Sequence, residues 1–524
     1  MRTIINYFFT NNNTPSAHTT SDMQRRATWI ALALILQALN EIDHNYYLPI
    51  LQQFTSLPPL FLLLGSFYAL WMAIRPTNGD CKGHDEASSS STQRHREVAR
   101  DTSTYRGVDD GLAPSRPLRS PSPLSSPSSL PPLSPLSSPS LWQRIVLFLT
   151  LILTIPGTIQ IGYTTFICFT PPVFTNDGTS LDTNAAILLL AGHNPYTDSN
   201  ILQITRRFHI QPNWTTPLRQ GTFANRLDYP TMDEFQTALD TAQKTGDASA
   251  FESKVSYPAL SFLTLVPFVA LHNYNVQPFY LLCYLLLVLL ACKWAQRELR
   301  RWVILLAIAN VPMLASTMGG NLDIFYTLLI ALAWWLRDRR WTSALFFGLA
   351  LASKQIAWYF IPFYFIMNWR LYGLKEAVYR LSIAGTLGLL INLPFIVWNP
   401  QAWLAGILAP VVDPMFPMGV GIVNLSVTHL IPYLPERVYT VLQIAAFLIS
   451  IAYYWRISRT QPESAIFFAV LPLFFNWRSL SSYFYCVAYP MFVLMAARSR
   501  PQIQAQQAGT GTEDTEQLPS PIRA

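Results

Sequence analysis

Apolar residues follow one another in long blocks along most of this chain. In its second half the blocks lie at 277–296, 301–318, 322–336, 342–353, 356–369, 378–398, 437–455, 464–477 and 481–497. A hydrocarbon core of about 30 Å takes roughly 20 apolar residues as a helix, whereas the strands of a membrane barrel alternate apolar and polar residues. These blocks do not alternate, so they predict membrane-spanning helices.

Three earlier runs, at 26–47, 57–74 and 145–169, complete the pattern. Together the runs predict an all-α, polytopic transmembrane helical bundle of about 12 spans. The predicted domains are a transmembrane hairpin at 1–75, a Ser/Pro-rich cytoplasmic linker at 76–140, a transmembrane domain at 141–500 and a tail at 501–524. The linker and the tail have compositions that cannot bury enough apolar surface to fold, so we expect both to be disordered.

The polar segment 170–256 is too long for a simple turn and carries charges of both signs. Loops of this length within a compact domain usually have structure or function of their own. We therefore expect a folded external loop. The stretch that follows, 257–272, is apolar but short, and we expect it to lie at the membrane surface without making a full crossing.

Lysine and arginine residues cluster in every second loop of the main domain, as in 293–301, 337–340 and 456–459. By the positive-inside rule these loops and both chain ends are cytoplasmic. The opposite, external face then holds the polar segments 170–256, 319–323, 353–355, 399–436 and 476–478. Polar residues that gather at one membrane face predict a site at that face.

The composition agrees with a membrane protein, because 51% of the residues are hydrophobic and 12% are charged, against about 25% charged in soluble domains. The net charge of +7 comes from the basic loops, so the expected partners are membrane lipids and not nucleic acid. The five cysteines are scattered and have no CxxC spacing. We therefore expect no disulfide framework, no metal site and no cofactor.

Two basic residues lie in apolar or aromatic surroundings. Lys354 separates the apolar stretches 347–352 and 356–366, where an ammonium needs a counter-anion, either Asp323 or the phosphate of a ligand. The alternative is a lysine that extends from a helix end to the interface. The guanidinium of Arg478 suits bidentate phosphate binding, or a structural cation–π or carbonyl contact. Both residues are candidate substrate-binding groups.

Asp177 and Asp182 open the external loop. Either carboxylate could act as the base for transfer to a hydroxyl acceptor, and both could instead be ordinary turn and cap residues. Asn321 and Asp323 follow two glycines at the start of a helix, where an amide cap and a carboxylate are also common. The residues alone leave these alternatives open.

Several short motifs follow one another between Leu141 and Ala497. They are Ala191-Gly192-His193-Asn194-Pro195-Tyr196, Tyr257-Pro258-Ala259-Leu260, Gly319 to Asp323, Gly348-Leu349-Ala350 with Lys354, and Asn392-Leu393-Pro394-Phe395. In this order they resemble the GT-C membrane glycosyltransferases, above all the bacterial polyprenyl-phosphate-mannose-dependent α-mannosyltransferase branch. Ala259 stands where that branch has a second proline, and the N-terminal hairpin has no counterpart in it.

The resemblance implies a glycosyltransferase that moves a hexose, mannose in this branch, from a polyprenyl-phosphate donor to a lipid or glycan acceptor at the external face of the cell membrane. It favours Asp177 as the base, because Asp182 would fall on the following helix. Lys354 and Arg478 would hold the phosphate leaving group, and no metal is expected. The further substrate-binding candidates are Asp323, Asn321, His193 and Arg226.

A multi-pass transporter or flippase is the alternative function, since about 12 helices and intramembrane charges also suit that class. Against it, the two halves of the sequence show no internal repeat, and the polar segments gather at one face instead of the midplane. A scaffold or receptor without catalytic activity would leave Lys354 and Arg478 unexplained. An enzyme requires Asp177 or Asp182 to lie within reach of these two cations.

Overall fold

The computed structural model describes residues 17–46, 58–75, 139–174, 176–211 and 214–498. Contacts divide the chain into two compact units, 1–74 with 143–524, and 75–142. The description below concerns the first unit. The expected linker at 76–140 and tail at 501–524 lie almost wholly outside the described residues, so both remain predictions.

The first unit is mostly helical, and four of its helices are long and apolar enough to cross a membrane. These are α5 (Leu141–Ile167), α12 (Gln277–Trp294), α18 (Leu374–Trp398) and α21 (Glu436–Ile457). The bent pair of α13 (Arg297–Ala309) and α14 (Val311–Met318) forms either a broken fifth span or a re-entrant loop. Shorter apolar helices are α3 (Pro58–Ile74), α15 (Asp323–Trp335), α19 (Pro400–Val412) and the segment Pro462–Phe475. The described helices thus support four or five spans, and the expected number of about 12 is not shown.

The bend of 55° between α13 and α14 has a local cause. The side chain of Asn310 accepts a hydrogen bond from the backbone N–H of Met313 and so starts a new helix. Pro312, in the first turn of α14, has no N–H with which to continue the hydrogen-bond ladder of α13. One apolar run of the sequence therefore becomes two helices.

The remaining helices of the bundle pack around a single large core. They are α2 (Ala17–Tyr46), α16 (Arg340–Leu351), η3 (Gln355–Phe360), α17 (Ile361–Tyr372), η4 (Pro462–Ser464), α22 (Ala465–Val470), η5 (Leu471–Phe475), α23 (Ser482–Tyr485) and α24 (Ala488–Arg498). Trp302, Trp334 and Tyr364 are among its largest fully buried side chains. Such a core is held mainly by close side-chain packing.

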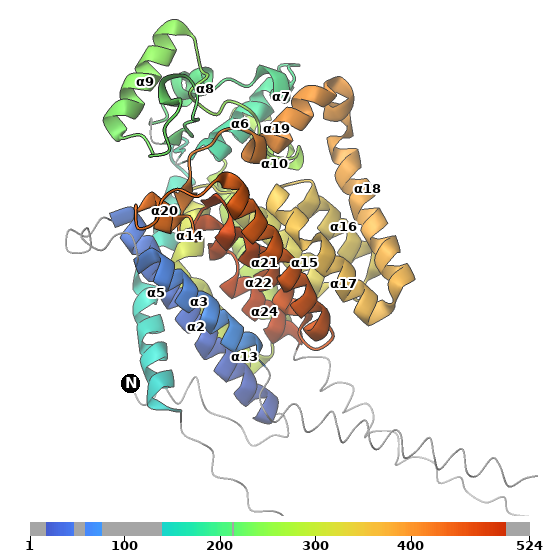
Figure 1. The fold of residues 1–524 in the computed structure, drawn as a ribbon. Helices are drawn as coiled ribbons and strands as arrows, with labels where there is room; N and C mark the ends of the chain where they lie inside the picture. The colour runs from blue at the N-terminus through green and yellow to red at the C-terminus, as the bar shows by residue number, and fades with distance from the viewer. Residues whose placement is uncertain (1–16, 47–57, 76–138, 175, 212–213, 499–524) are drawn as a thin grey trace, which may run out of the picture. The chain divides into compact units, whose positions relative to one another are not determined.

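The polar segment 170–256 contains helices and a small core of its own. Its elements are α6 (Asp177–Leu190), α7 (Pro195–Asp198), α8 (Ile201–Phe208), η2 (Gly221–Phe223) and α9 (Met232–Thr245). Two short helices follow it, α10 (Leu260–Leu263) and α11 (Val266–Ala270), and a later segment contains α20 (Asn424–Val427). Figure 1 shows α6 to α9 close together beside α19. Phe223, Phe235, Phe251 and Phe416 form the core. The expected surface stretch 257–272 consists of α10 and α11, and neither is long enough to cross a bilayer.

Two short strands join distant parts of the chain. β1 (Met418–Gly419) pairs in parallel with β2 (Arg478–Ser479). Gly419 has φ +132°, and a Cβ atom there would lie 2.0 Å from the carbonyl oxygen of Ser479. Only glycine lets the two strands approach so closely. This pairing fixes the backbone from which the Arg478 side chain extends.

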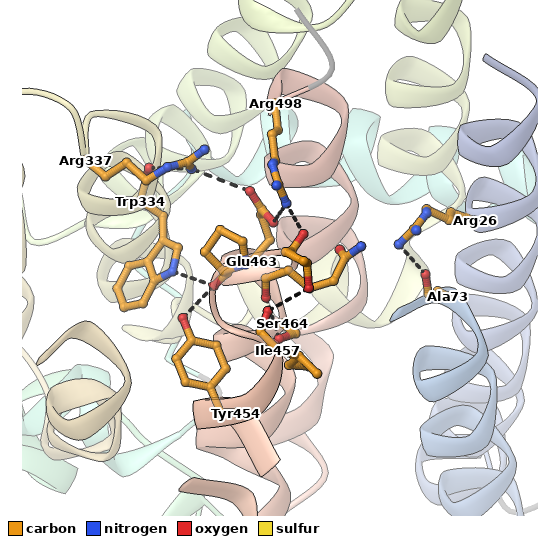
Figure 2. A network of polar contacts seen from close by, with 12 residues as sticks. Arg26, Ala73, Trp334, Arg337, Tyr454, Ile457, Glu463, Ser464 and Arg498 are labelled. Carbon is orange, nitrogen blue, oxygen red and sulfur yellow. Dashed lines mark hydrogen bonds and ion pairs between the residues drawn. The ribbon is translucent and has the colours of Figure 1, made fainter. Parts of the chain in front are cut away.

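A buried carboxylate, Glu463, connects several bundle helices (Figure 2). Arg337 and Arg498 form ion pairs with it at 3.5 and 3.4 Å. One residue earlier, the carbonyl oxygen of Pro462 accepts hydrogen bonds from the Trp334 indole and the Tyr454 hydroxyl, both at 2.9 Å. The network therefore holds α15, α21, α24 and the segment before α22 together at the basic loops.

Candidate active site

The start of helix α6 is fixed on the glycine turn that precedes α15. Asn176 caps α6 by accepting a hydrogen bond from the N–H of Thr179 at 2.8 Å, and its amide donates to the carbonyl of Gly319 at 2.7 Å. The Thr179 hydroxyl donates to the carbonyl of Gly320 at 2.5 Å. Gly320 has φ +70°, a conformation that glycine adopts at little cost. These bonds bring Asp177, the first residue of α6, to the segment that carries Asp323.

Asp323 and Lys354 form a buried ion pair. The Lys354 Nζ lies 2.6 Å from the Asp323 Oδ1, and both side chains are less than 10% exposed. The ammonium also lies 5.2 Å from the ring centre of Tyr257 and 5.9 Å from that of Tyr326. Of the two counter-anions that the sequence allows, the structure shows Asp323. A buried charge of this kind is tolerated only when it is paired.

Asp182 lies inside the protein and does not face the solvent. It is 1% exposed, and its Oδ1 accepts a hydrogen bond from the Ser261 hydroxyl at 2.9 Å, which joins α6 to α10. Burial raises the pKa of the Asp182 carboxyl to about 7, although the Ser261 hydroxyl and the Lys354 charge act in the opposite direction. An acceptor cannot reach this carboxyl without displacing the residues around it.

Asp177, in contrast, is half-buried. Within the described part of the chain its carboxylate has neither an ion pair nor a hydrogen bond. It stands in the first turn of α6, where a carboxylate complements the positive end of the helix dipole. Of the two candidate bases, Asp177 is the one that a substrate can approach.

Arg478 is a cation without an anionic partner in the described ranges. Its Nη1 lies 2.6 Å from the sulfur of Met415, and its Nη2 lies 3.5 Å from that of Met418. The neighbouring Trp477 indole donates to the carbonyl of Met415 at 3.1 Å, which fixes this segment. Thioether sulfur is a weak acceptor, so the guanidinium keeps most of its capacity to bind an anion.

The hydroxyl of Tyr483 lies within electrostatic range of Arg478, Lys354, Asp323 and Asp177. All four charged candidates therefore act on this one hydroxyl. Tyr257 is likewise within range of Lys354, Asp323 and both loop aspartates. No pattern in the sequence indicates a role for these tyrosines, although Tyr257 begins the motif Tyr257-Pro258-Ala259-Leu260 and Tyr483 follows Arg478 closely.

The other expected substrate-binding residues have local partners. His193 is exposed and lies 3.3 Å from Asp198, and Arg226 forms an ion pair with Glu234 at 2.8 Å. The Asn321 amide donates to the Ser316 hydroxyl at 3.3 Å. Among the described residues no side-chain bond joins His193 or Arg226 to Asp177 or Arg478, whereas Asn321 lies on the turn that docks α6.

The described side chains gather an accessible carboxylate, an unpaired guanidinium and a buried ion pair. They include no group of three or more His, Cys, Asp or Glu residues arranged to hold a metal. A carboxylate such as Asp177 can take a proton from a hydroxyl. A guanidinium such as Arg478 can bind a phosphate. The arrangement thus combines a base with an anion-binding group.

Comparison with known proteins finds one family model that matches part of the chain. Residues 256–475 match the model of glycosyltransferase family 87. This family, GT87, is a GT-C family of membrane glycosyltransferases. The match confirms the GT-C resemblance of the motifs at the level of the family, and it covers less than half of the 524 residues. No curated protein and no solved structure matches the chain.

The segment that matches GT87 contains only part of the candidate active site. Asp323 and Lys354 lie within it, whereas Asp177 and Asp182 precede it and Arg478 follows its end by three residues. The half-buried carboxylate of Asp177 and the guanidinium of Arg478 thus both lie outside the matched residues. Hydrogen bonds of Asn176 and Thr179 to Gly319 and Gly320 bring the start of α6 to the matched segment that carries Asp323.

Proposed function

We propose that this protein transfers a hexose, mannose by preference, from a polyprenyl-phosphate donor to a lipid or glycan acceptor at the non-cytoplasmic face of the cell membrane. The observation that carries the proposal is that hydrogen bonds of Asn176 and Thr179 to the Gly319–Gly320 turn hold the start of α6, with the half-buried carboxylate of Asp177, at the segment that carries the Asp323–Lys354 pair. The GT87 match supports the reaction class. Several candidate membrane-spanning helices support a multi-pass membrane protein.

In the proposed reaction Asp177 is the base. Its carboxylate takes the proton of the acceptor hydroxyl while that oxygen forms a bond to the anomeric carbon of the donor sugar. The bond between this carbon and the phosphate oxygen breaks, and the electron pair leaves with the phosphate. Attack from the side opposite the leaving group inverts the anomeric centre. Asp182 supports α6 from within the protein instead of acting on the substrate.

Arg478 is the group that meets the leaving phosphate. Charge grows on the phosphate in the transition state, and fixed positive groups stabilise it there. Lys354 contributes less than its charge suggests, because Asp323 neutralises it at 2.6 Å. Its part is to hold the start of α15 and the ring of Tyr257 behind the reacting groups.

The orientation belongs to the same proposal. The polyprenyl chain keeps the donor in the bilayer, so its head group has to be met at a membrane face. The basic clusters in alternate loops support an external position for the site residues and a cytoplasmic position for both chain ends.

The test is sugar transfer by purified full-length protein in detergent, given polyprenyl-phosphate-mannose and a panel of acceptors. We expect Asp177→Asn and Arg478→Gln each to reduce the rate at least ~100-fold, since each removes one catalytic interaction. Asp198→Asn is the matched control, because Asp198 is an exposed aspartate of the same loop that pairs with His193. It should keep the wild-type rate.

Elution volume and melting temperature must show that each variant is folded. Full activity of Asp177→Asn would move the base elsewhere. If the wild type neither transfers sugar to an acceptor nor hydrolyses the donor with any isoprenoid-linked sugar, the transporter becomes the better interpretation.

A further inference from the structure

Tyr229 presents a partly exposed ring on the external loop. The residue is 40% exposed, although its ring packs against Phe235 and Phe416, with centroid distances of 5.8 and 5.6 Å. Both phenylalanines belong to the buried core of the loop. The loop core therefore fixes the ring in place and leaves part of it accessible.

Asp228, the residue before Tyr229, has polar partners in a later segment of the chain. Asp228 accepts a hydrogen bond from the Tyr433 hydroxyl at 3.0 Å and lies 3.6 Å from the Nε2 of His429. The Asp228 and His429 side chains are 64% and 68% exposed. A carboxylate and an imidazole, from segments about 200 residues apart, thus meet at the residue that precedes Tyr229.

The ring also lies toward the candidate active site. Desolvation raises the pKa of the Tyr229 hydroxyl to about 12, with Arg478 acting against the shift and Asp177 adding to it. Both charges are therefore close enough to affect this hydroxyl. The contacts of the ring point the same way, because Phe416, at 5.6 Å from the ring, directly follows Met415, whose sulfur lies 2.6 Å from the Arg478 Nη1.

We propose that Tyr229, Asp228 and His429 form a binding subsite for a pyranose ring next to the candidate active site. Aromatic faces carry negative charge density, which suits the weakly positive C–H groups on one face of a pyranose. Carboxylate and imidazole groups are hydrogen-bond partners for its hydroxyls. The subsite rests on the proposed function, and the sugar it holds is either the transferred hexose or a sugar of the acceptor.

Kinetics of Tyr229→Leu and Tyr229→Phe separate these two sources. Leucine keeps apolar volume against Phe235 and Phe416 and loses the flat ring, whereas phenylalanine keeps the ring. An acceptor subsite predicts that Tyr229→Leu raises the KM for the acceptor about tenfold, equivalent to ~1.4 kcal/mol, without changing donor hydrolysis. A donor subsite predicts that both reactions weaken. Tyr229→Phe should stay near the wild type in either case.

Met232→Ala is the control, because Met232 lies on the same loop and is 54% exposed. It should leave every parameter unchanged. Asp228→Ala should weaken the same step as Tyr229→Leu. The subsite is overturned if Tyr229→Leu matches the wild type within twofold for transfer and hydrolysis.

A binding measurement keeps the subsite testable even if the protein transfers no sugar. Saturation-transfer NMR with methyl α-mannopyranoside as the probe should show binding to the wild type and to Tyr229→Phe, and a strongly reduced signal with Tyr229→Leu. Absence of a signal with the wild type, or an equal signal with all three proteins, overturns the subsite whatever the fate of the transferase proposal.

Discussion

For Lys354, the sequence indicates that the charge needs a partner, and the structure identifies that partner as Asp323. The sequence indicates that an ammonium among apolar residues needs an anion. It leaves the choice between a carboxylate and a ligand open. The structure supplies the carboxylate at 2.6 Å, with both groups buried. The pair therefore belongs to the framework of the site, whereas Arg478 remains open to an anion.

This interpretation predicts an unequal response to substitution. Lys354→Met leaves the Asp323 carboxylate buried and unpaired, which should cost about 3–5 kcal/mol of unfolding free energy. The double variant Lys354→Met/Asp323→Leu removes both charges and should recover much of that loss. Thermal unfolding in detergent measures both.

Arg226→Met is the control for this pair, because Arg226 forms an ion pair with Glu234 that is largely exposed. Pairs of that kind contribute less than about 1 kcal/mol. Equal destabilisation by the single Lys354 variant and the double variant would show that the pair is not the cause.

At the scale of elements, the apolar runs locate most bundle helices. The run 378–398 corresponds to α18 and the run 437–455 to α21, because each helix must offer the bilayer a long apolar surface. The run 464–477 is less regular in the structure, where it divides into α22 and η5. Pro472 lies in the first turn of η5 and cannot continue the ladder of α22.

The site was less accessible to prediction than the helices. The sequence identifies charged residues in apolar surroundings, since their cost is a local property. It does not show that Ser261 donates to Asp182, or that the sulfur of Met415 meets Arg478. Such contacts join segments that are 63 and 79 residues apart, and no periodicity encodes them. The sequence likewise does not indicate that Tyr483 is close enough to Asp323, Lys354 and Asp177 to interact with their charges, because these residues belong to distant segments.

One contact between elements should make stability depend on pH. Glu252, in the external loop, is buried, and the Lys254 ammonium lies 2.7 Å from both oxygens of Asp413, just after α19. Burial raises the pKa of Glu252 from its ordinary 4.5 to about 8; the Lys254 N–H lowers it and Asp413 raises it. Because the folded-state pKa is the higher one, the associated stability is complete below pH 4.5 and is lost as the pH rises through 8.

We therefore expect the melting temperature to fall by several degrees between about pH 6 and 9, and Glu252→Gln to flatten this slope. Glu234→Gln is the control, because Glu234 has its pKa lowered to about 2. Its protonation affects stability only in acid, so the slope should persist in that variant. A slope that also survives Glu252→Gln would assign the dependence to another group.

At the scale of the whole molecule, the N-terminal hairpin has no counterpart in the motif resemblance and precedes the GT87 match. Its side chains nevertheless enter the main core. Phe67 of α3 makes edge-to-face contacts with Phe467, Phe474 and Phe484, at centroid distances of 5.8, 5.6 and 5.3 Å. Gln37 of α2 donates to the carbonyl of Phe484 at 3.4 Å. The hairpin thus contacts the residues on both sides of Arg478.

These contacts predict that the hairpin and the segment that matches GT87 unfold together. Phe67→Ala removes a buried ring, 8% exposed, and should cost about 3–5 kcal/mol. Calorimetry in detergent should show one transition that moves as a whole to lower temperature. Phe61→Ala is the matched control, since Phe61 lies on the same helix and is 62% exposed, so it should shift the transition little.

The form of the transition decides between one unit and two. If the hairpin were an independent domain, Phe67→Ala would lower a separate, smaller transition and leave the main one in place, because the lost contacts would stabilise the hairpin alone. If the hairpin is part of one cooperative core, the loss at Phe67 destabilises the packing of Phe474 and Phe484 as well. Arg478 and Tyr483 lie between these two phenylalanines in the sequence, so sugar transfer should then fall as the main transition moves.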